Sequence, residues 1–408
     1  MKRMLIFAVL AAFLLGAMAY ATETRVMTMG EVNNIVKDEA NINMYPSTIN
    51  YYPKLFIGEF SADSYYPDKD GSNYLWKVGA HFPFGEESDK PWVLGAYFSE
   101  EYYYNDILYY DKSPESAGKL MSLYYGRNLG EMPFGFVFSY FNNKYKNEDT
   151  LKYYNEEEAL SRMEFSLGIS PLDKKLDIGA GIAFTTWTDE EFRVVDGDSA
   201  MRPITKPSGN MDLMITARYW MDPMGKYVLV PHAGLLYCKQ GGDFYGNVED
   251  EWAVGVTRED KTMELELGLG MNYEASENVL LVGDVGMALE NEKWTEDYVD
   301  TAATDYESEY KWMALPYFKI GIDGEVFKWL NLRCGAWTRW TRSSQKWDGQ
   351  YDRSWTYVST STYFGAGFHW NNLVLDAAMN TDFLENGPYF ISGENDYLTE
   401  QVTLKYMF

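Results

Sequence analysis

The sequence predicts an all-β protein, a transmembrane antiparallel up-and-down β-barrel of about sixteen strands that follows a short N-terminal segment. Three observations carry this prediction. The chain of 408 residues opens with an export signal, segments of alternating apolar and polar residues recur along it, and no apolar run long enough to span a bilayer follows residue 21. Because every backbone group inside a bilayer must be hydrogen-bonded, a chain without spanning helices can cross only as a closed barrel.

The export signal is assigned to residues 1–21. A short basic start is followed by an apolar run over residues 5–15 and then by small residues. Two Ala-x-Ala patterns end at Ala19 and Ala21, and this is the pattern that signal peptidase reads, so we expect cleavage after Ala21 with Ala19 as the alternative. An uncleaved anchor is disfavoured, because the run is shorter than the roughly 20 apolar residues of a spanning helix.

Residues 22–50 form an N-terminal segment that is expected to be either a plug inside the barrel or a periplasmic tail. It carries Gly30, Asp38, Asn41 and Pro46 in that order. The order resembles the N-terminal segment of the FadL-like family of outer-membrane channels for hydrophobic compounds, in which a Gly-rich stretch, an acidic residue and an Asn-Pro-Ala motif form a hatch. The resemblance implies a plug made by these four residues. A disordered tail is the alternative.

Residues 51–408 are assigned to the barrel. Between Thr262 and Tyr273 the odd positions are Met, Leu or Tyr, whereas the even positions are Thr, Glu, Gly or Asn. Such period-two alternation suits a wall between lipid and water. A soluble sandwich would also alternate. The export signal, together with 34 Tyr and 13 Trp residues that suit membrane interfaces, favours the membrane.

Sixteen segments have strand character, and fourteen is the alternative count because the first three are the weakest. We predict strands at 51–60, 72–82, 91–101, 117–127, 132–143, 159–170, 174–187, 209–220, 226–238, 260–273, 277–290, 309–323, 328–341, 355–369, 372–382 and 397–408. Tight periplasmic turns are expected to alternate with long outer loops. The predicted loops cover 61–71, 102–116, 144–158, 188–208, 239–259, 291–308, 342–354 and 383–396.

The last predicted strand carries a second targeting signal. Val402, Leu404, Tyr406 and Phe408 share one face. This strand resembles the C-terminal signature of outer-membrane barrel proteins, an aromatic last residue preceded by alternating apolar residues. The resemblance implies that these four residues are an assembly signal read by the barrel-assembly machinery. It implies a bacterial outer-membrane location, with outer-membrane lipid and lipopolysaccharide as surroundings.

Charged residues on the polar faces are predicted to line the pore. They are Arg162, Glu164, Asp177, Asp212, Arg218, Glu264, Glu266, Asp284, Lys319, Arg333, Arg339, Asp376 and Lys405. Both signs occur, and a barrel of sixteen strands leaves a water-filled channel that can solvate them. Each one could instead be merely solvated, or pair across strands and stiffen the wall.

The net charge of -26 argues against nucleic acid as a partner. Much of the acid falls in the predicted loops, which could form a hydrated surface or a cation-attracting vestibule. The only cysteines, Cys238 and Cys334, fall on strands counted as four apart in the sheet. That separation exceeds the reach of a disulfide, so both are expected to be free thiols.

No enzyme, cofactor or metal site is predicted. The three histidines, His81, His232 and His369, fall on separate strands, and no nucleophile or metal motif occurs. Glu264 and Glu266 share a face and could bind a divalent cation, but two acids at this spacing are common by chance. The acidic stretches 68–71 and 196–198 are interpreted as turns.

These observations predict an outer-membrane channel for passive diffusion of small polar or cationic solutes. The first alternative is a FadL-like transporter of hydrophobic compounds. The second is a structural or adhesive barrel that acts through its acidic extracellular loops. The pattern is compatible with a homo-oligomer but shows no subunit interface.

Overall fold

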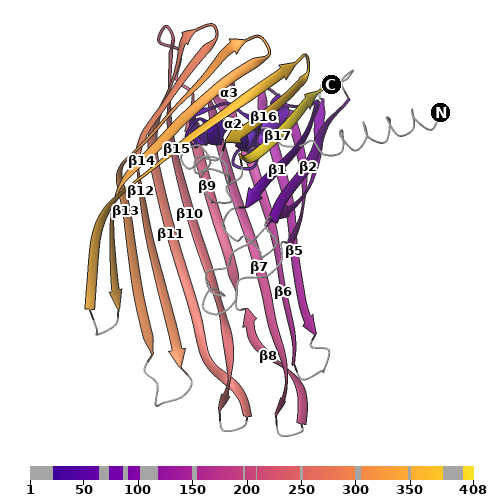
Figure 1. Cartoon of the computed structure of the whole chain (residues 1–408), viewed down its shortest axis with the longest axis vertical. Coiled ribbons are helices and arrows are strands. Elements are labelled where there is room, and N and C mark those ends of the chain that lie inside the picture. The colour runs from indigo at the N-terminus through magenta and orange to yellow at the C-terminus, as the bar shows by residue number, and fades with distance from the viewer. Residues whose placement is uncertain are drawn as a thin grey trace, which may run out of the picture.

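The computed structural model describes residues 22–63, 73–85, 91–101, 118–148, 154–195, 198–207, 209–248, 251–298, 305–347, 351–379 and 398–408. The chain is an all-β protein whose strands form one closed antiparallel barrel (Figure 1). Neighbouring strands in sequence pair with each other, and β1 (Leu55–Asp63) pairs with β17 (Thr399–Met407) to close the sheet. The predicted fold class is confirmed.

The barrel has sixteen strand positions, because two of its seventeen strands share one position. Both β8 (Asp198–Pro207) and β9 (Asn210–Tyr219) lie between β7 (Leu176–Val195) and β10 (Tyr227–Val248), one above the other. The predicted count of sixteen is confirmed, and fourteen is wrong. The remaining strands are β2 (Asn73–Phe84), β3 (Trp92–Glu101), β4 (Gly118–Leu129), β5 (Met132–Glu148), β6 (Tyr154–Ile169), β11 (Glu251–Ser276), β12 (Val279–Tyr298), β13 (Tyr306–Phe327), β14 (Leu330–Trp347), β15 (Tyr351–Trp370) and β16 (Leu373–Met379).

The outer face of the barrel is apolar, as a lipid-facing wall requires. Leu167, Met263, Leu267 and Ile320 are exposed there. Their polar neighbours in sequence point into the barrel, because side chains alternate along a strand. Among the described residues, no helix is long and apolar enough to cross a membrane.

Several predicted loops are wrong, because the strands continue through them. Most of the predicted loop 239–259 belongs to the antiparallel ladder of β10 and β11, which pair from Lys239↔Lys261 to Val248↔Glu251. Similar pairing extends into the predicted loops 144–158, 291–308 and 342–354, and the predicted loop 188–208 contains β8. The predicted loops 102–116 and 383–396 lie outside the described residues, as do the predicted export signal, residues 1–21, and positions 64–71 of the predicted loop 61–71.

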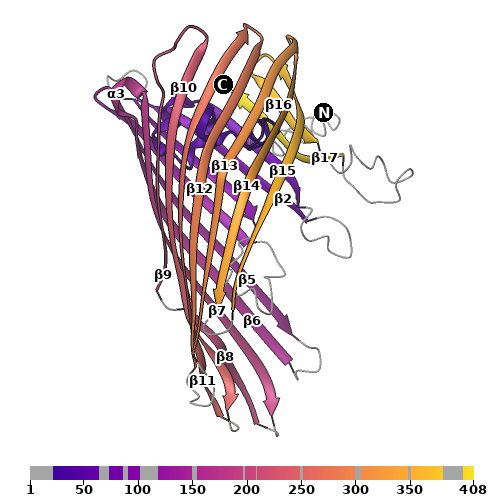
Figure 2. The ribbon, with the colours of Figure 1, turned by 90° about the vertical axis from the view of Figure 1, so that its left-hand side faces the viewer.

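The ladder extensions make the wall uneven in height. A strand crosses a bilayer with about 9–11 residues, and β17 has 9 residues whereas β11 has 26. Figure 2 shows the long strands running far below the short ones. The longest hairpins therefore project beyond the bilayer on the side opposite the short turns.

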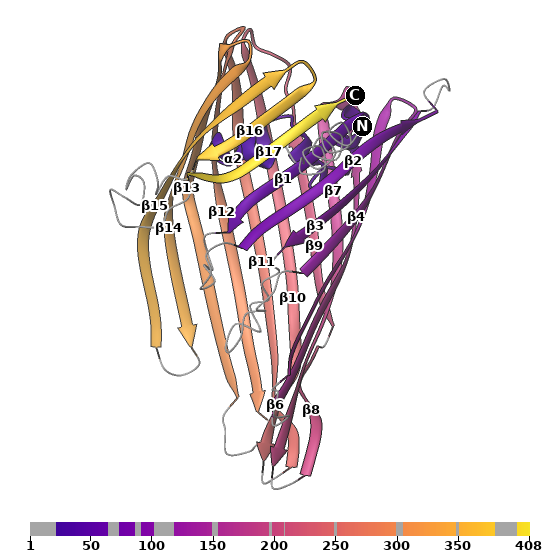
Figure 3. The same cartoon turned by 45° about the vertical axis from the view of Figure 1, so that its right-hand side comes forward.

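The N-terminal segment lies inside the barrel, at the end where the short turns are (Figures 1 and 3). It consists of short helices, α2 (Thr22–Thr28), η1 (Asn33–Ile35), η2 (Glu39–Ile42) and η3 (Pro46–Tyr51). The first helix packs against β14 to β17, and η3 packs against β3 to β7. The segment thus contacts strands on different sides of the barrel. A further short helix, α3 (Pro171–Lys174), forms the turn between β6 and β7.

Candidate functional site

The candidate site is the lumen and the N-terminal segment within it. Inward-facing glycines let this segment approach the wall. A Cβ added at Gly135 would lie 2.0 Å from the carbonyl oxygen of Pro46, and one added at Gly321 would lie 2.2 Å from that of Met29. Similar clashes would arise at Gly168, Gly179, Gly335 and Gly365. Glycine in a strand permits such close backbone approach, so this part of the wall fits the N-terminal segment.

Arg218 of β9 links the wall to the segment. Its Nε donates a hydrogen bond to Asp177 Oδ2 at 2.9 Å, and both side chains are almost fully buried. Its Nη1 donates to the carbonyl oxygen of Val36 at 3.1 Å and also to Asn41 Oδ1. The guanidinium lies 4.3 Å from the ring centroid of Tyr45. One cation therefore satisfies a buried carboxylate and three groups of the segment.

The carboxylate of Asp177 has further partners that fix its position. Ser170 Oγ donates a hydrogen bond to its Oδ1 at 2.6 Å, and Trp220 Nε1 donates to its Oδ2 at 3.1 Å. Ser170 also lies 2.8 Å, Oγ to Oγ, from Ser47 of the segment. The charge-assisted network around Asp177 therefore reaches η3 through Ser47.

A second set of ion pairs holds the other side of the segment. Arg25 of α2 contacts Asp38 Oδ2 at 2.8 Å and Asp323 Oδ2 at 3.0 Å. Arg333 of β14 lies 3.2 Å from Asp323 Oδ1 and also contacts Asp376. These charges alternate in sign, so each buried carboxylate has a cation beside it.

Lys405 of the last strand contacts Glu39 of η2. Burial away from water raises the pKa of Glu39 to about 7, with a further contribution from the nearby Asp38 carboxylate, while Lys405 acts in the opposite direction. Desolvation disfavours the charged form of a carboxyl group. Glu39 is therefore the group of the segment that takes up a proton near neutral pH.

The four residues assigned to a plug all lie in this packed segment. Gly30 has a positive φ of 85° and approaches the backbone of Ala336. The carboxylate of Asp38 accepts the contact from Arg25, and its Oδ1 caps η2 by accepting from the amide of Ala40 at 3.3 Å. Asn41 accepts from Arg218, and Pro46 opens η3.

The residues predicted to line the pore fall into two groups. Asp177, Arg218, Lys319, Arg333, Asp376 and Lys405 contact the segment or belong to its ion-pair network. The others, Arg162, Glu164, Asp212, Glu264, Glu266, Asp284 and Arg339, lie on the inner wall beyond it. Sequence reasoning missed the contacts of the first group, because their partners are far away in the chain.

Beyond the segment, the inner wall of β11 and β12 carries an acidic strip, which consists of Asp260, Glu264, Glu290 and Glu292. Glu264 lies directly opposite Glu290 in the ladder. Their inward direction follows from Gly270 of the same strand, whose Cβ would meet Ile35 of the segment. Like charges directly opposite each other destabilise a sheet, so the pair of Glu264 and Glu290 concentrates negative charge at this place on the wall.

An apolar cluster adjoins the strip. Phe141, Leu160 and Trp187 are buried together on β5, β6 and β7, and Trp294 of β12 packs against them. On the same inner wall Arg162 contacts Asp212, while the guanidinium of Arg339 lies over the ring of Trp337. The outer part of the lumen therefore offers carboxylates and aromatic faces side by side.

The residues of the predicted assembly signal lie on or next to β17. Tyr406 and Phe408 are exposed, and the rings of Phe408 and Phe82 lie 5.6 Å apart. Val402 is half-buried and Leu404 is buried. Lys405, on the opposite face, points inward to the segment.

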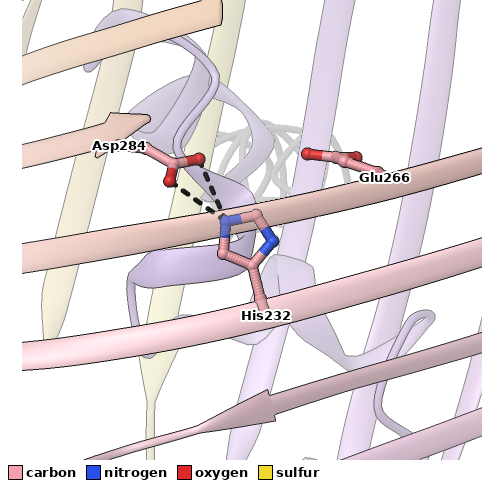
Figure 4. Close-up of side chains that lie close together, drawn as sticks. All are labelled: His232, Glu266 and Asp284. Carbon is pink, nitrogen blue, oxygen red and sulfur yellow. Dashed lines mark hydrogen bonds and ion pairs between the residues drawn. The ribbon is translucent and has the colours of Figure 1, made fainter. Parts of the chain in front are cut away.

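The two cysteines are free thiols, whereas His81 and His232 each have a polar partner. Cys238 and Cys334 are free and lie on β10 and β14, four positions apart, as expected. His81 Nδ1 lies 2.8 Å from the carbonyl oxygen of Tyr52. His232 was missed as a candidate. Its Nε2 lies 3.1 Å from each carboxylate oxygen of Asp284, beside Glu266 (Figure 4).

Comparison with known proteins gives a structural likeness only. No family model matches the chain, and no curated protein matches its sequence. The toluene transporter TbuX of Ralstonia pickettii is 11% identical, with a TM-score of 0.41, over 94% of this chain and 97% of its own. CdiB from Acinetobacter baumannii is 10% identical, with a TM-score of 0.40, over 87% of this chain and 60% of its own.

The ferric citrate transporter FecA is 7% identical, with a TM-score of 0.37, over 80% of this chain and 66% of its own. The present chain thus spans less than two thirds of the CdiB and FecA chains. At these values the likenesses carry no argument about what passes through this barrel.

Proposed function

We propose that this chain is a bacterial outer-membrane channel for small polar solutes, with a preference for cations, and that its N-terminal segment plugs the lumen at the periplasmic end. A solute would enter between the long hairpins and travel along the inner wall. It would pass the segment only when the segment moves. No energy source or cofactor enters this proposal.

The acidic strip is the observation that carries the preference for cations. Glu264 and Glu290 face each other across the ladder, and Glu292 lies two residues further along the same face. A local excess of one sign of charge on a lumen wall raises the local concentration of the opposite ion, because low-dielectric walls focus the field. Cations are therefore favoured over anions in the outer half of the lumen.

Reversal potentials in a KCl gradient test this proposal. The protein is reconstituted in planar bilayers, and openings of the wild type and of a variant without residues 22–51 are recorded. We expect a cation-selective current. The double variant E264Q/E290Q should shift the reversal potential towards zero, since it removes two like charges from one rung of the ladder.

E259Q is the matched control. Glu259 lies on the same strand but on the outer face, where it pairs with Lys239 and Lys261. Its substitution should leave the reversal potential unchanged. An anion-selective current in the wild type, or a double variant with the selectivity of the wild type, would contradict the proposal.

A transporter of hydrophobic compounds is the second candidate, and the apolar cluster around Trp187 favours it. Phe141, Leu160 and Trp187 are buried together, and Trp294 packs against them; sites for apolar molecules are lined by such side chains. Quenching of tryptophan fluorescence by toluene or a fatty acid tests this candidate. Saturable quenching that W187F weakens would favour it over the channel for polar solutes, and the absence of saturable binding would remove it.

A further inference from the structure

We propose that His232, Glu266 and Asp284 bind a divalent transition-metal ion on the inner wall of the barrel. The three residues come from adjacent strands, β10, β11 and β12. Their candidate ligand atoms, one nitrogen and two carboxylate oxygens, all lie within 4.8 Å of one another. This inference does not depend on the proposed transport function.

The register of the sheet builds the site. His232 pairs with Gly268, and Gly268 pairs with Gly286. A Cβ at Gly268 would lie 2.4 Å from His232 Nε2, and one at Gly286 would lie 2.5 Å from the hydroxyl of Tyr317. The two glycines therefore leave the space that the His232 imidazole and the Tyr317 hydroxyl occupy. Figure 4 shows the two carboxylates on either side of the His232 ring.

Charge balance is the main argument for a metal ion. The side chains of His232 and Asp284 are each only 2% exposed, and Glu266 is half-buried. In the part of the chain that the structure describes, neither carboxylate forms an ion pair with a lysine or an arginine. Lys319 lies opposite Asp284 in the ladder but donates to the carbonyl oxygen of Glu31. A protonated histidine would offset one negative charge, whereas a divalent ion with a neutral histidine offsets both. Buried charges require such compensation.

Tyr317 supports the site from the next strand. Its hydroxyl donates a hydrogen bond to Glu266 Oε1 at 2.8 Å. Residues that hold a ligating carboxylate in this way fix its direction and are a regular part of metal sites. Tyr317 is thus assigned as a positioning residue, not as a ligand.

The donor set indicates the class of metal. Imidazole suits Zn²⁺, Ni²⁺ and Fe²⁺, whereas a site for Mg²⁺ or Ca²⁺ uses oxygen donors alone. Ligand atoms around a tetrahedral Zn²⁺ lie about 3.3 Å from one another. Nε2 of His232 is 3.1 Å from each carboxylate oxygen of Asp284. Only the carboxylate of Glu266 must move closer for all three ligand atoms to reach one ion.

Equilibrium dialysis of the tag-free, detergent-solubilised full chain against ZnCl₂ tests the inference. We expect one tightly bound zinc ion per chain, and loss of that ion in H232Q and in D284N. Y317F should retain the site but weaken zinc binding by about 10–100-fold, as the loss of an orienting partner does. Co²⁺ in place of Zn²⁺ should show the visible absorption of a nitrogen- and oxygen-ligated ion.

E164Q is the matched control, because Glu164 is a carboxylate on the inner wall of β6, outside the cluster. It should bind zinc as the wild type does. Wild-type protein that binds no stoichiometric zinc, or H232Q that binds it with wild-type affinity, would overturn the inference. If H232Q fails to fold, which gel mobility before and after heating reports, Y317F and the Co²⁺ spectrum of the wild type decide. The inference would then be overturned if Y317F bound zinc with wild-type affinity and Co²⁺ added to the wild-type protein kept the spectrum of the free ion.

Discussion

Arg218 Nε donates to Asp177 Oδ2 at 2.9 Å, and both side chains are buried between the barrel wall and the N-terminal segment. The same guanidinium reaches Val36 and Asn41 of the segment. The ion pair thus belongs both to the wall and to the contact that holds the segment. A substitution at Arg218 or Asp177 should therefore affect both the barrel wall and the packing of the N-terminal segment.

Substitution of Arg218 by glutamine should loosen the segment. It leaves the Asp177 carboxylate buried without its cation, and breaking such a pair costs about 3–5 kcal/mol. Hydrogen exchange of residues 22–51, measured by mass spectrometry, should become faster by roughly two orders of magnitude or more. The double variant R218Q/D177N should recover part of the protection. Unchanged exchange in R218Q would show that the pair does not hold the segment.

Alanine at Gly321 should displace the segment without removing any polar contact. The new Cβ would lie 2.2 Å from the Met29 carbonyl oxygen, which is backbone and cannot rotate away. Overpacking of this kind costs about 1–3 kcal/mol. Trypsin cleavage after Arg25 and Lys37 should therefore accelerate by roughly tenfold. G283A is the control, since its nearest heavy atom would be 4.0 Å away, and it should be cleaved at the wild-type rate.

Acidification should tighten the packing of the segment. The pKa of Glu39 is raised to about 7 in the packed state from an ordinary value of 4.5, so the packed form binds a proton more strongly than the released form. Proton uptake by Glu39 therefore stabilises the packed form of the segment fully below the ordinary pKa of 4.5, and this stabilisation is lost as the pH rises through 7. The frequency of channel openings should increase between about pH 5 and pH 8.

E39Q provides the control for this pH dependence. Glutamine is neutral at every pH and keeps an oxygen that can accept from Lys405. The variant should therefore show a flat profile at the low opening frequency that the wild type has in acid. A wild-type profile that opens more often in acid would contradict the assigned direction.

Arginine at Ile320 should destabilise the barrel in lipid. Ile320 is 61% exposed on the outer face, and an arginine near the middle of the bilayer costs about 2–4 kcal/mol. Refolding into lipid vesicles at graded guanidinium chloride measures this cost. T295R, on the outer face of β12 beyond Lys293, should cost at most about 1 kcal/mol. Equal costs for both variants would contradict the assigned position of the bilayer.

The strands were predictable because lipid imposes a local rule. Every second residue of a spanning strand is apolar, and this rule is visible in residues 262–273 without knowledge of the partners. The ladder extensions were not predictable in this way. Outside the bilayer the outer face no longer needs apolar residues, and Glu259, Lys261 and Lys293 interrupt the alternation. Pairing continues there, but its sequence signal is lost.

The contacts of the lumen depend on pairs that are far apart in sequence. Arg218 and Val36 are separated by 182 residues, and His232 and Asp284 by 52. The sequence nevertheless carried a signal that the N-terminal segment and His232 approach the wall. Glycines on inward positions, such as Gly168 and Gly268, mark places where another group approaches the wall. Combined with the hairpin register, Gly268 would have placed His232 next to Asp284.

Single-channel conductance with and without residues 22–51 decides whether the N-terminal segment obstructs the lumen. The variant joins the export signal directly to Tyr52 and is compared with G283A and the wild type in planar bilayers. We expect rare, small openings in the wild type and in G283A, and a large, steady conductance in the deletion variant. Equal conductance in all three, with the barrel shown to be folded, would contradict this expectation.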